Sequence, residues 1–286
     1  KDFWCIGLGS IYSVSVSPLN KKYCSYNNNE MILGKSNIDS DFYDSLVFCV
    51  GYITAIQIPD FINHISSCAF SSSQITSITI PSSIVIIDKG AFFENQNLIE
   101  VNFSEDSKLQ IIEIQAFYGT SIKSIKIPAS VIHMKRACFG NCRQLQQIEF
   151  AEDSKLKTIE PVAFTSVPIE SITIPSEVTE LKECWRAGMR KLKRISVSPL
   201  NKCYRSIEDK VIIGKTDIES NDYDCLMACI VNNDTFDIPD YIKRICGYSL
   251  SDTLIESITI PFEVTSIGKG AFANCFQLKH VNFVNN

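Results

Sequence analysis

The 286-residue chain has no excess of positive charge, because 27 Lys and Arg residues are outnumbered by 32 Asp and Glu residues and the net charge is -5. A protein that binds nucleic acid is expected to carry a basic face and a high isoelectric point. We therefore predict no nucleic-acid partner.

Long apolar runs are also missing. The longest, from Leu46 to Ile56, is interrupted by Gly51 and Thr54 and is shorter than the roughly 20 residues that span a bilayer. The first ten residues lack the basic segment, apolar segment and cleavage site of a secretion signal. We predict no membrane helix, so any membrane attachment would depend on segments outside this sequence.

Histidine is scarce, and motifs that depend on it are absent. The three copies, His64, His133 and His280, lie far apart, and none is near a Cys-x2-Cys pair. A structural zinc site needs such clustered ligands, and the Gly-x-Ser-x-Gly motif of many hydrolases does not occur. We predict no catalytic residues, no metal site, no cofactor and no enzymatic activity.

Isoleucine, in contrast, occurs 41 times. Such enrichment in one β-branched residue indicates that the same buried position recurs along the chain. Six Ile-Pro dipeptides, from Ile58-Pro59 to Ile260-Pro261, each end an alternating run such as Ile75-Thr-Ser-Ile-Thr-Ile80. The alternation predicts a short strand with one buried face, and proline ends it because proline cannot donate the next ladder hydrogen bond.

The runs belong to a repeat. Apolar residues follow each of these prolines at three and six positions, as Ile84 and Ile87 follow Pro81. Further units without proline, such as Val101-Asn-Phe103, lie between some of the Ile-Pro units, so that one repeat is 22–24 residues long. Repeats this short cannot bury their own apolar side, so they must stack into a solenoid. We expect strands to start at Ile53, Ile75, Leu98, Ile122, Leu145, Ile169, Asn233, Ile255 and Leu278, with longer units opening at Ile11 and Leu192.

A second, larger period is present. Residues 14–21 recur as residues 195–202, and Gly34-Lys35 recurs 180 positions later as Gly214-Lys215. Each long unit carries an insert, at about residues 19–52 and 200–232, in which turn-prone residues separate apolar runs, as in a β-hairpin at the edge of the solenoid. We predict a single solenoid domain over residues 1–286. Because Trp4 recurs as Trp185, the chain opens within a repeat, and we interpret it as a fragment.

The units Ile75-Thr-Ser-Ile-Thr-Ile-Pro81 and Ile255-Glu-Ser-Ile-Thr-Ile-Pro261, followed by Ala91-Phe92 and Ala271-Phe272, resemble the BspA-like leucine-rich repeats of the Treponema pallidum type. The resemblance implies a curved right-handed superhelix with a parallel sheet on its concave face and return segments made of turns, 3-10 turns or helices. It also implies a surface-antigen protein that adheres to host matrix or other cells. Trp185-Arg186, Ser249-Leu250 and Cys138-Phe139 depart from the Ala-Phe pattern.

The twelve cysteines do not follow the internal duplication, since only Cys49 has a cysteine counterpart, Cys229. A disulfide framework would survive duplication, so we expect mostly free, buried thiols. Secreted chains usually pair their thiols, and the cysteines therefore leave the compartment open.

Three weaker motifs have simple interpretations. Gly34-Lys35-Ser36 and its counterpart lack the preceding glycine of a phosphate loop and are interpreted as hairpin turns. The acidic residues at 39–44 and 217–224 do not follow an EF-hand pattern and are expected to be solvated. Asn102 and Asn233 begin N-glycosylation patterns, which matter only in a secreted chain.

The outward strand residues form the candidate binding surface, because sheets of solenoids present large preformed faces. These residues are Thr54, Gln57, Thr76, Thr79, Asn102, Lys123, Lys126, Gln146, Glu149, Glu170, Thr173, Lys193, Arg194, Glu256 and Thr259, together with Asp237, Lys279, His280 and Asn282.

The functional prediction is a cell-surface or secreted, non-enzymatic module for adhesion to a protein or glycan ligand, for example a host matrix or cell-surface protein. The alternative is an intracellular, cytoplasmic scaffold for protein-protein interaction, which the unpaired cysteines favour.

Overall fold

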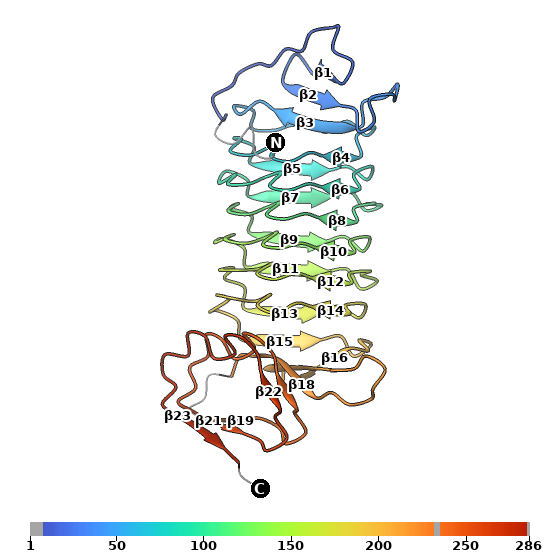
Figure 1. Cartoon of the computed structure of the whole chain (residues 1–286). Helices are drawn as coiled ribbons and strands as arrows, with labels where there is room; N and C mark the ends of the chain where they lie inside the picture. The colour runs from blue at the N-terminus through green and yellow to red at the C-terminus, as the bar shows by residue number, and fades with distance from the viewer. Residues whose placement is uncertain (1–7, 232–234, 285–286) are drawn as a thin grey trace.

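The computed structural model describes residues 8–231 and 235–284. Its strands form two stacks (Figure 1). In the first stack, one side is built from four-residue parallel strands, which are β5 (Ser77–Ile80), β7 (Glu100–Phe103), β9 (Ser124–Ile127), β11 (Gln147–Phe150), β13 (Ser171–Ile174) and β15 (Arg194–Val197). Figure 1 shows them in a nearly straight column, so the expected curvature is not pronounced in this view.

The other side of the first stack is a second parallel sheet of two-residue strands. These are β4 (His64–Ile65), β6 (Ile86–Ile87), β8 (Ile111–Ile112), β10 (His133–Met134), β12 (Thr158–Ile159) and β14 (Glu180–Leu181). The residues six after the repeat prolines, such as Ile87 and Met134, end these strands and are fully buried. Each repeat is therefore a coil with two strands, whose apolar sides meet in one core.

The return segments contain turns and no helix in the described residues, which corrects the helical alternatives. Each segment has two residues with left-handed φ, four positions apart. In successive coils the pairs are Cys68 and Ser72, Gly90 and Glu94, Gln115 and Gly119, Ala137 and Asn141, and Val162 and Ser166. Because left-handed residues interrupt a right-handed helix, the segment folds as a tight loop.

Between the members of each pair lies a phenylalanine that faces the core. Phe70, Phe92, Phe117 and Phe139 stack with ring centroids 4.9, 5.0 and 5.2 Å apart and nearly parallel planes, and Phe164 follows at 6.3 Å. Trp185 meets Phe164 edge-on at 6.4 Å and ends the series. This phenylalanine ladder fills the loop side of the core.

The antiparallel strands β1 (Tyr23–Tyr26), β2 (Met31–Gly34) and β3 (Ser45–Cys49) continue the short-strand sheet, since β3 pairs in parallel with β4. They lie within the predicted insert at residues 19–52 and are an extension of the solenoid sheet. The second stack repeats this order with β16 (Tyr204–Ile207), β17 (Val211–Gly214), β18 (Cys225–Cys229), β20 (Arg244–Ile245) and β22 (Ser266–Ile267).

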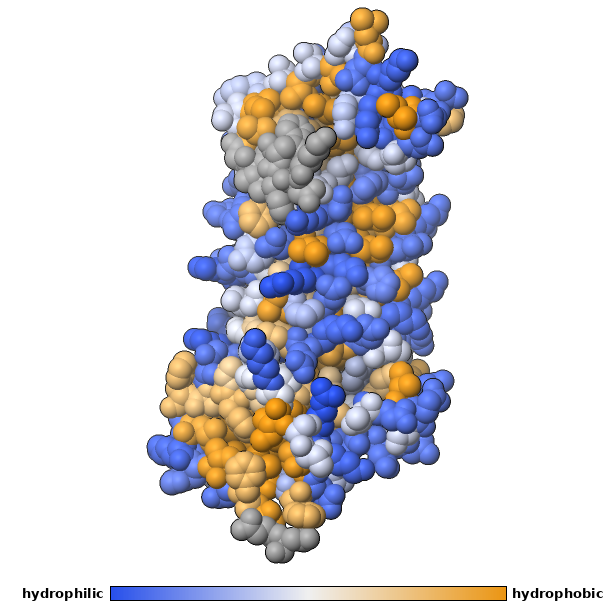
Figure 2. All heavy atoms as spheres, viewed as in Figure 1, coloured by the Kyte–Doolittle hydropathy of each residue, from blue (hydrophilic) through white to orange (hydrophobic). Residues whose placement is uncertain are grey.

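The long-strand side of the second stack comprises β19 (Thr235–Asp237), β21 (Ser257–Ile260) and β23 (His280–Phe283), all parallel. The strand expected at Asn233 begins outside the described residues. In Figure 1 the strands of this stack run at a steep angle to those of the first. Residues such as Leu226, Ile245 and Ile258 form a second core cluster, whereas Tyr204, Ile212 and Ala228 belong to the core of the first stack. Figure 2 shows apolar side chains gathered at this end, where Phe276 and Phe283 are 85% and 62% exposed.

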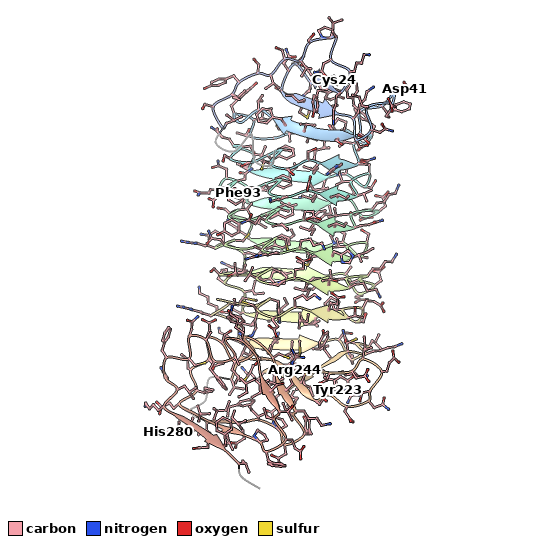
Figure 3. The ribbon with its side chains drawn as sticks, viewed as in Figure 1. Cys24, Asp41, Phe93, Tyr223, Arg244 and His280 are labelled. Atoms are coloured by element: carbon pink, nitrogen blue, oxygen red, sulfur yellow. The ribbon has the colours of Figure 1, made fainter. Side chains whose placement is uncertain are left out.

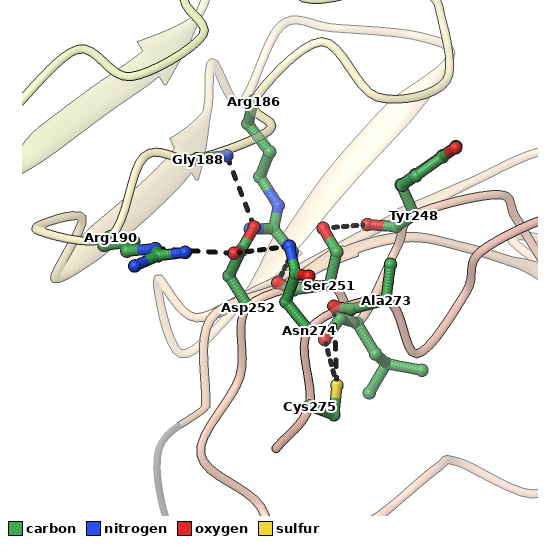
Figure 4. A network of polar contacts seen from close by, with 10 residues as sticks. Arg186, Gly188, Arg190, Tyr248, Ser251, Asp252, Ala273, Asn274 and Cys275 are labelled. Atoms are coloured by element: carbon green, nitrogen blue, oxygen red, sulfur yellow. Dashed lines mark hydrogen bonds and ion pairs between the residues drawn. The ribbon is translucent and has the colours of Figure 1, made fainter.

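Arg186 links the two stacks from the position that phenylalanine occupies in the other coils. Its side chain is 4% exposed, and one terminal nitrogen, Nη2, donates to the carbonyl oxygens of Cys229, Ser249 and Ser251 at 2.7, 2.8 and 3.4 Å. Burial lowers the pKa of this guanidinium. Nearby, Asp252 accepts a hydrogen bond from the Gly188 backbone at 3.3 Å (Figure 4). A buried cation thus replaces the aromatic ring where one stack meets the next.

Candidate functional site

The outward side of the first stack's long strands presents two parallel rows of polar side chains. Strand alternation buries residues such as Ile78 and Ile80 and exposes the residues between them. We call this surface the long-strand face. It consists of Ser77, Thr79, Glu100, Asn102, Ser124, Lys126, Gln147, Glu149, Ser171, Thr173, Arg194 and Ser196.

The parallel register fixes neighbours across this face. Thr79 lies beside Asn102, Lys126 beside Glu149, and Thr173 beside Ser196. The Thr173 and Ser196 hydroxyls are 2.8 Å apart. Short contacts of this kind hold the polar rows in fixed positions and limit the rotamer freedom that a ligand would otherwise have to remove.

Hydrogen bonds along single strands have the same effect. Asn102 donates from Nδ2 to Glu100 Oε1 at 2.7 Å, and Gln147 donates from Nε2 to Glu149 Oε1 at 2.7 Å. Both bonds join residues two apart, which point to the same side of a strand. The two outward carboxylates of β7 and β11 are therefore oriented by a neighbouring amide.

Three depressions follow one another along the face. The central one has a volume of about 750 Å³ and is lined by Glu100, Asn102, Lys126 and Glu149 among others. It shares Asn102 with a depression of about 420 Å³ on one side, and it shares Lys126 and Glu149 with one of about 820 Å³ on the other. Together they form a trough that crosses several coils.

The structure brings together most of the residues predicted for the surface. Thr79, Asn102, Lys126, Glu149, Thr173 and Arg194 are exposed on the strands, whereas Thr76, Lys123, Gln146, Glu170 and Lys193 are exposed one residue before a strand begins. Of the last group, Glu170 and Lys193 form an ion pair at 2.8 Å, and the hydrogen bond from Lys193 lowers the pKa of Glu170.

Other predicted residues lie elsewhere. Thr54 and Gln57 are exposed, but no strand forms over residues 53–58, so the strand expected at Ile53 is wrong. Glu256 and Thr259 are half-buried and belong to the second stack, as do Asp237, Lys279, His280 and Asn282. Lys279 forms an ion pair with Glu256 at 3.0 Å.

Half of the long-strand face was missed from the sequence. Ser77, Glu100, Ser124, Gln147, Ser171 and Ser196 also point outward. Residues alternate between the two faces of a strand, so Ser77, which precedes the buried Ile78, should have been predicted to point outward. The same alternation identifies the missed residues in the other coils.

The remaining motifs of the sequence have structural roles. Gly34 and Gly214 end strands β2 and β17, and Asp224 accepts hydrogen bonds from the Thr216 backbone and hydroxyl at 2.9 and 2.7 Å. Asp44 makes the equivalent contacts with Ser36. These acidic residues therefore close a turn of each antiparallel unit.

Within residues 8–231 and 235–284, no group of three or more His, Cys, Asp or Glu side chains is arranged to hold a metal ion. Apart from Cys68, ten cysteines of these residues are free, and seven of them are buried.

No helix in the described part of the chain has the length and apolar character needed to cross a bilayer.

The two-strand coils, their stacked phenylalanines and the outward polar rows define a leucine-rich-repeat β-solenoid. The chain belongs to the family described as BspA type Leucine rich repeat region, which matches in six copies over residues 44–142, 110–223 and 209–286. The match indicates no catalytic family. A comparison with curated proteins found no relative of significant similarity.

Solved structures share the fold. The pneumococcal vaccine antigen PcpA is 20% identical, with 94% of this chain and 71% of that chain aligned at a TM-score of 0.76. A leucine rich cell surface protein from Faecalibacterium prausnitzii A2-165 is 21% identical, with 91% and 76% aligned at a TM-score of 0.65.

Proposed function

We propose that this chain is a non-enzymatic binding module of a cell-surface or secreted protein, and that it holds a protein ligand against the long-strand face. The observation that carries the proposal is the continuous trough over that face, whose polar rows are held in fixed positions by the ladder register. A rigid, preformed surface of this kind lowers the entropic cost of binding.

Location at the cell surface is supported by the structural relatives, one of which is described as a vaccine antigen and the other as a cell surface protein. Host matrix proteins, other cell-surface proteins and glycans are the ligands to test. The face carries both signs of charge, with Lys126 and Arg194 near Glu100 and Glu149. A ligand of mixed charge suits it better than a polyanion.

A scaffold inside the cell is the second candidate. It is favoured by the ten free cysteines that the described residues contain besides Cys68, because secreted proteins usually pair their thiols. Localising the full-length protein in its own cells, by antibody labelling with and without permeabilisation, separates the two candidates. Labelling only after permeabilisation would contradict the surface proposal.

The binding role is tested by screening the recombinant chain against immobilised matrix proteins and glycans, followed by variants. Lys126→Glu and Thr79→Arg change the trough without touching the core, and we expect each to weaken binding at least about tenfold. Arg143→Glu, an exposed position on a return segment, is the matched control and should leave affinity unchanged. Equal effects of face and control variants, or no binding to any protein in the panel, would contradict the proposal.

A further inference from the structure

Three sulfur atoms meet where β18 leads into the coil of β20. Cys225 and Met227 flank the core residue Leu226 in β18, where the register with β17 shifts by one residue, and Cys246 follows β20 directly. The Cys246 thiol lies 3.3 Å from Met227 Sδ, and the Thr216 hydroxyl lies 3.0 Å from Cys225 Sγ. We call Cys225, Met227 and Cys246 the sulfur cluster.

The cluster is shielded from bulk solvent but lies near the surface. Cys225 and Cys246 are 3% and 5% exposed, and Met227 is half-buried. Arg244, which pairs with Cys225 across the strands, is exposed. Figure 3 shows Arg244 and Tyr223 in the second stack, at the opposite end of the molecule from Cys24.

The internal duplication shows that the fold does not require sulfur here. The counterparts of Cys225, Met227 and Cys246, 180 positions earlier, are Ser45, Val47 and Ser66. The strands around both sets pair alike: Ser45 opposes His64 in β4 as Cys225 opposes Arg244 in β20. All three sulfur ligands are therefore present in one copy of the unit and absent from the other.

A disulfide is not the natural state of the two thiols. Because Cys225 is in register with Arg244, Cys246 is displaced from it by two residues along the neighbouring strand. Strand spacing and rise place such Cα atoms about 8 Å apart, beyond the span of up to about 7 Å that a disulfide bridges. Two longer metal-sulfur bonds can span this separation.

We propose that the sulfur cluster binds a soft monovalent metal ion of the Cu(I) class, with the Cys225 and Cys246 thiolates and the Met227 thioether as ligands. Thiolate and thioether sulfur select Cu(I), whereas Zn²⁺ sites need four ligands. Both thiols release their protons to the solvent as the two sulfur-metal bonds form, and the oxidation state of the metal does not change.

The surroundings favour this chemistry. The hydrogen bond between the Cys246 and Cys225 thiols lowers the pKa of Cys225 to about 7, so the Cys225 thiolate is accessible at neutral pH. The same hydrogen bond, together with burial, raises the pKa of Cys246, so the metal must displace the Cys246 proton. Two thiolates with one monovalent ion leave one negative charge near the Arg244 guanidinium, which also lies 4.0 Å from the Glu183 carboxylate. In a trigonal site with metal-sulfur bonds of about 2.3 Å, the sulfur atoms lie about 4 Å from one another. The Cys246 and Met227 sulfur atoms are 3.3 Å apart, so binding requires them to move apart by less than about 1 Å.

The test is an anaerobic titration of the reduced full chain with Cu(I) supplied as its bicinchoninate complex. The wild type should remove one more equivalent of Cu(I) than the triple variant Cys225→Ser, Met227→Val, Cys246→Ser. That variant installs the side chains of the duplicate unit, so it should fold, which its melting temperature checks. Cys24→Ser, a half-buried thiol in the first antiparallel unit, is the control and should retain the extra equivalent.

X-ray absorption at the copper edge of the loaded wild type gives a readout that does not depend on any variant. Sulfur-only coordination with bonds near 2.3 Å is expected. Equal stoichiometry in the wild type and the triple variant, or nitrogen and oxygen ligands in the absorption data, would overturn the proposal.

Discussion

Val162 adopts a left-handed backbone conformation, with a φ of 53°. A β-branched side chain disfavours this region by about 1–2 kcal/mol, yet the coil holds Val162 there because its backbone N-H donates to the Cys184 carbonyl of the next coil at 3.1 Å. The equivalent positions carry Cys68, Gly90 and Gln115. Stacking of the coils, and not local preference, therefore sets the conformation.

This strain gives a prediction for Val162. Replacement by glycine removes the unfavourable β-carbon and should raise the free energy of unfolding by about 1 kcal/mol relative to Val162→Ala, which deletes most of the same side chain but keeps a β-carbon. Urea denaturation of the two variants measures the difference. If the alanine variant is as stable as the glycine variant, the backbone at this position is not strained.

The return loops could not be predicted from single residues for the same reason. Gly, Gln, Ala and Val at equivalent left-handed positions share no chemistry that a sequence pattern could detect. The phenylalanine positions, in contrast, repeat with the period of the coils, and their burial follows from that period.

At the scale of the element, the long strand follows its pattern closely. Ile78 and Ile80 are 3% and 0% exposed in β5, and the outward Thr79 between them faces the trough. The short strands are only two residues long, too few for alternation to be visible, so their existence as a second sheet was not predictable. Residues 53–58 form no strand, although the next coil is joined to this part of the chain by backbone hydrogen bonds from Gln74 to Gly51 and from Thr76 to Thr54.

The register of β5 is tested by a pair of neighbouring substitutions. Ile78→Asp places an unpaired charge between stacked coils and should prevent folding. Thr79→Asp puts the same charge one residue further along, in solvent, and should keep the wild-type circular dichroism spectrum and a melting temperature within a few degrees. Normal folding of the Ile78 variant would show that the register is wrong.

At the scale of the whole molecule, the core of the first stack extends into the second through Tyr204, Ile212 and Ala228, and the coils beyond them have a second core cluster. Arg186 adds a polar link between the two stacks. In the sequence, the Arg186 position is recognisable only because Trp185-Arg186 departs from the Ala-Phe pattern. Its role depends on carbonyl groups 43 to 65 residues away in the chain, which no local pattern identifies. The binding face was partly predictable because it repeats, whereas this junction and the sulfur cluster occur once in the described chain.

Arg186→Met should weaken the junction. The methionine fills a similar volume but cannot donate, so the Cys229 and Ser249 carbonyls lose a charged donor in a buried place, at a cost of about 1–3 kcal/mol. We expect a lower melting temperature and faster tryptic cleavage between residues 190 and 204, measured on the full chain. Arg143→Met is the matched control, since Arg143 is exposed on a return segment of the first stack and its side chain bonds to the nearby Asn141. Exposed substitutions of this kind change the free energy of unfolding by at most about 0.5 kcal/mol, so this control should unfold like the wild type. Equal behaviour of the two variants would mean that the buried guanidinium does not stabilise the junction.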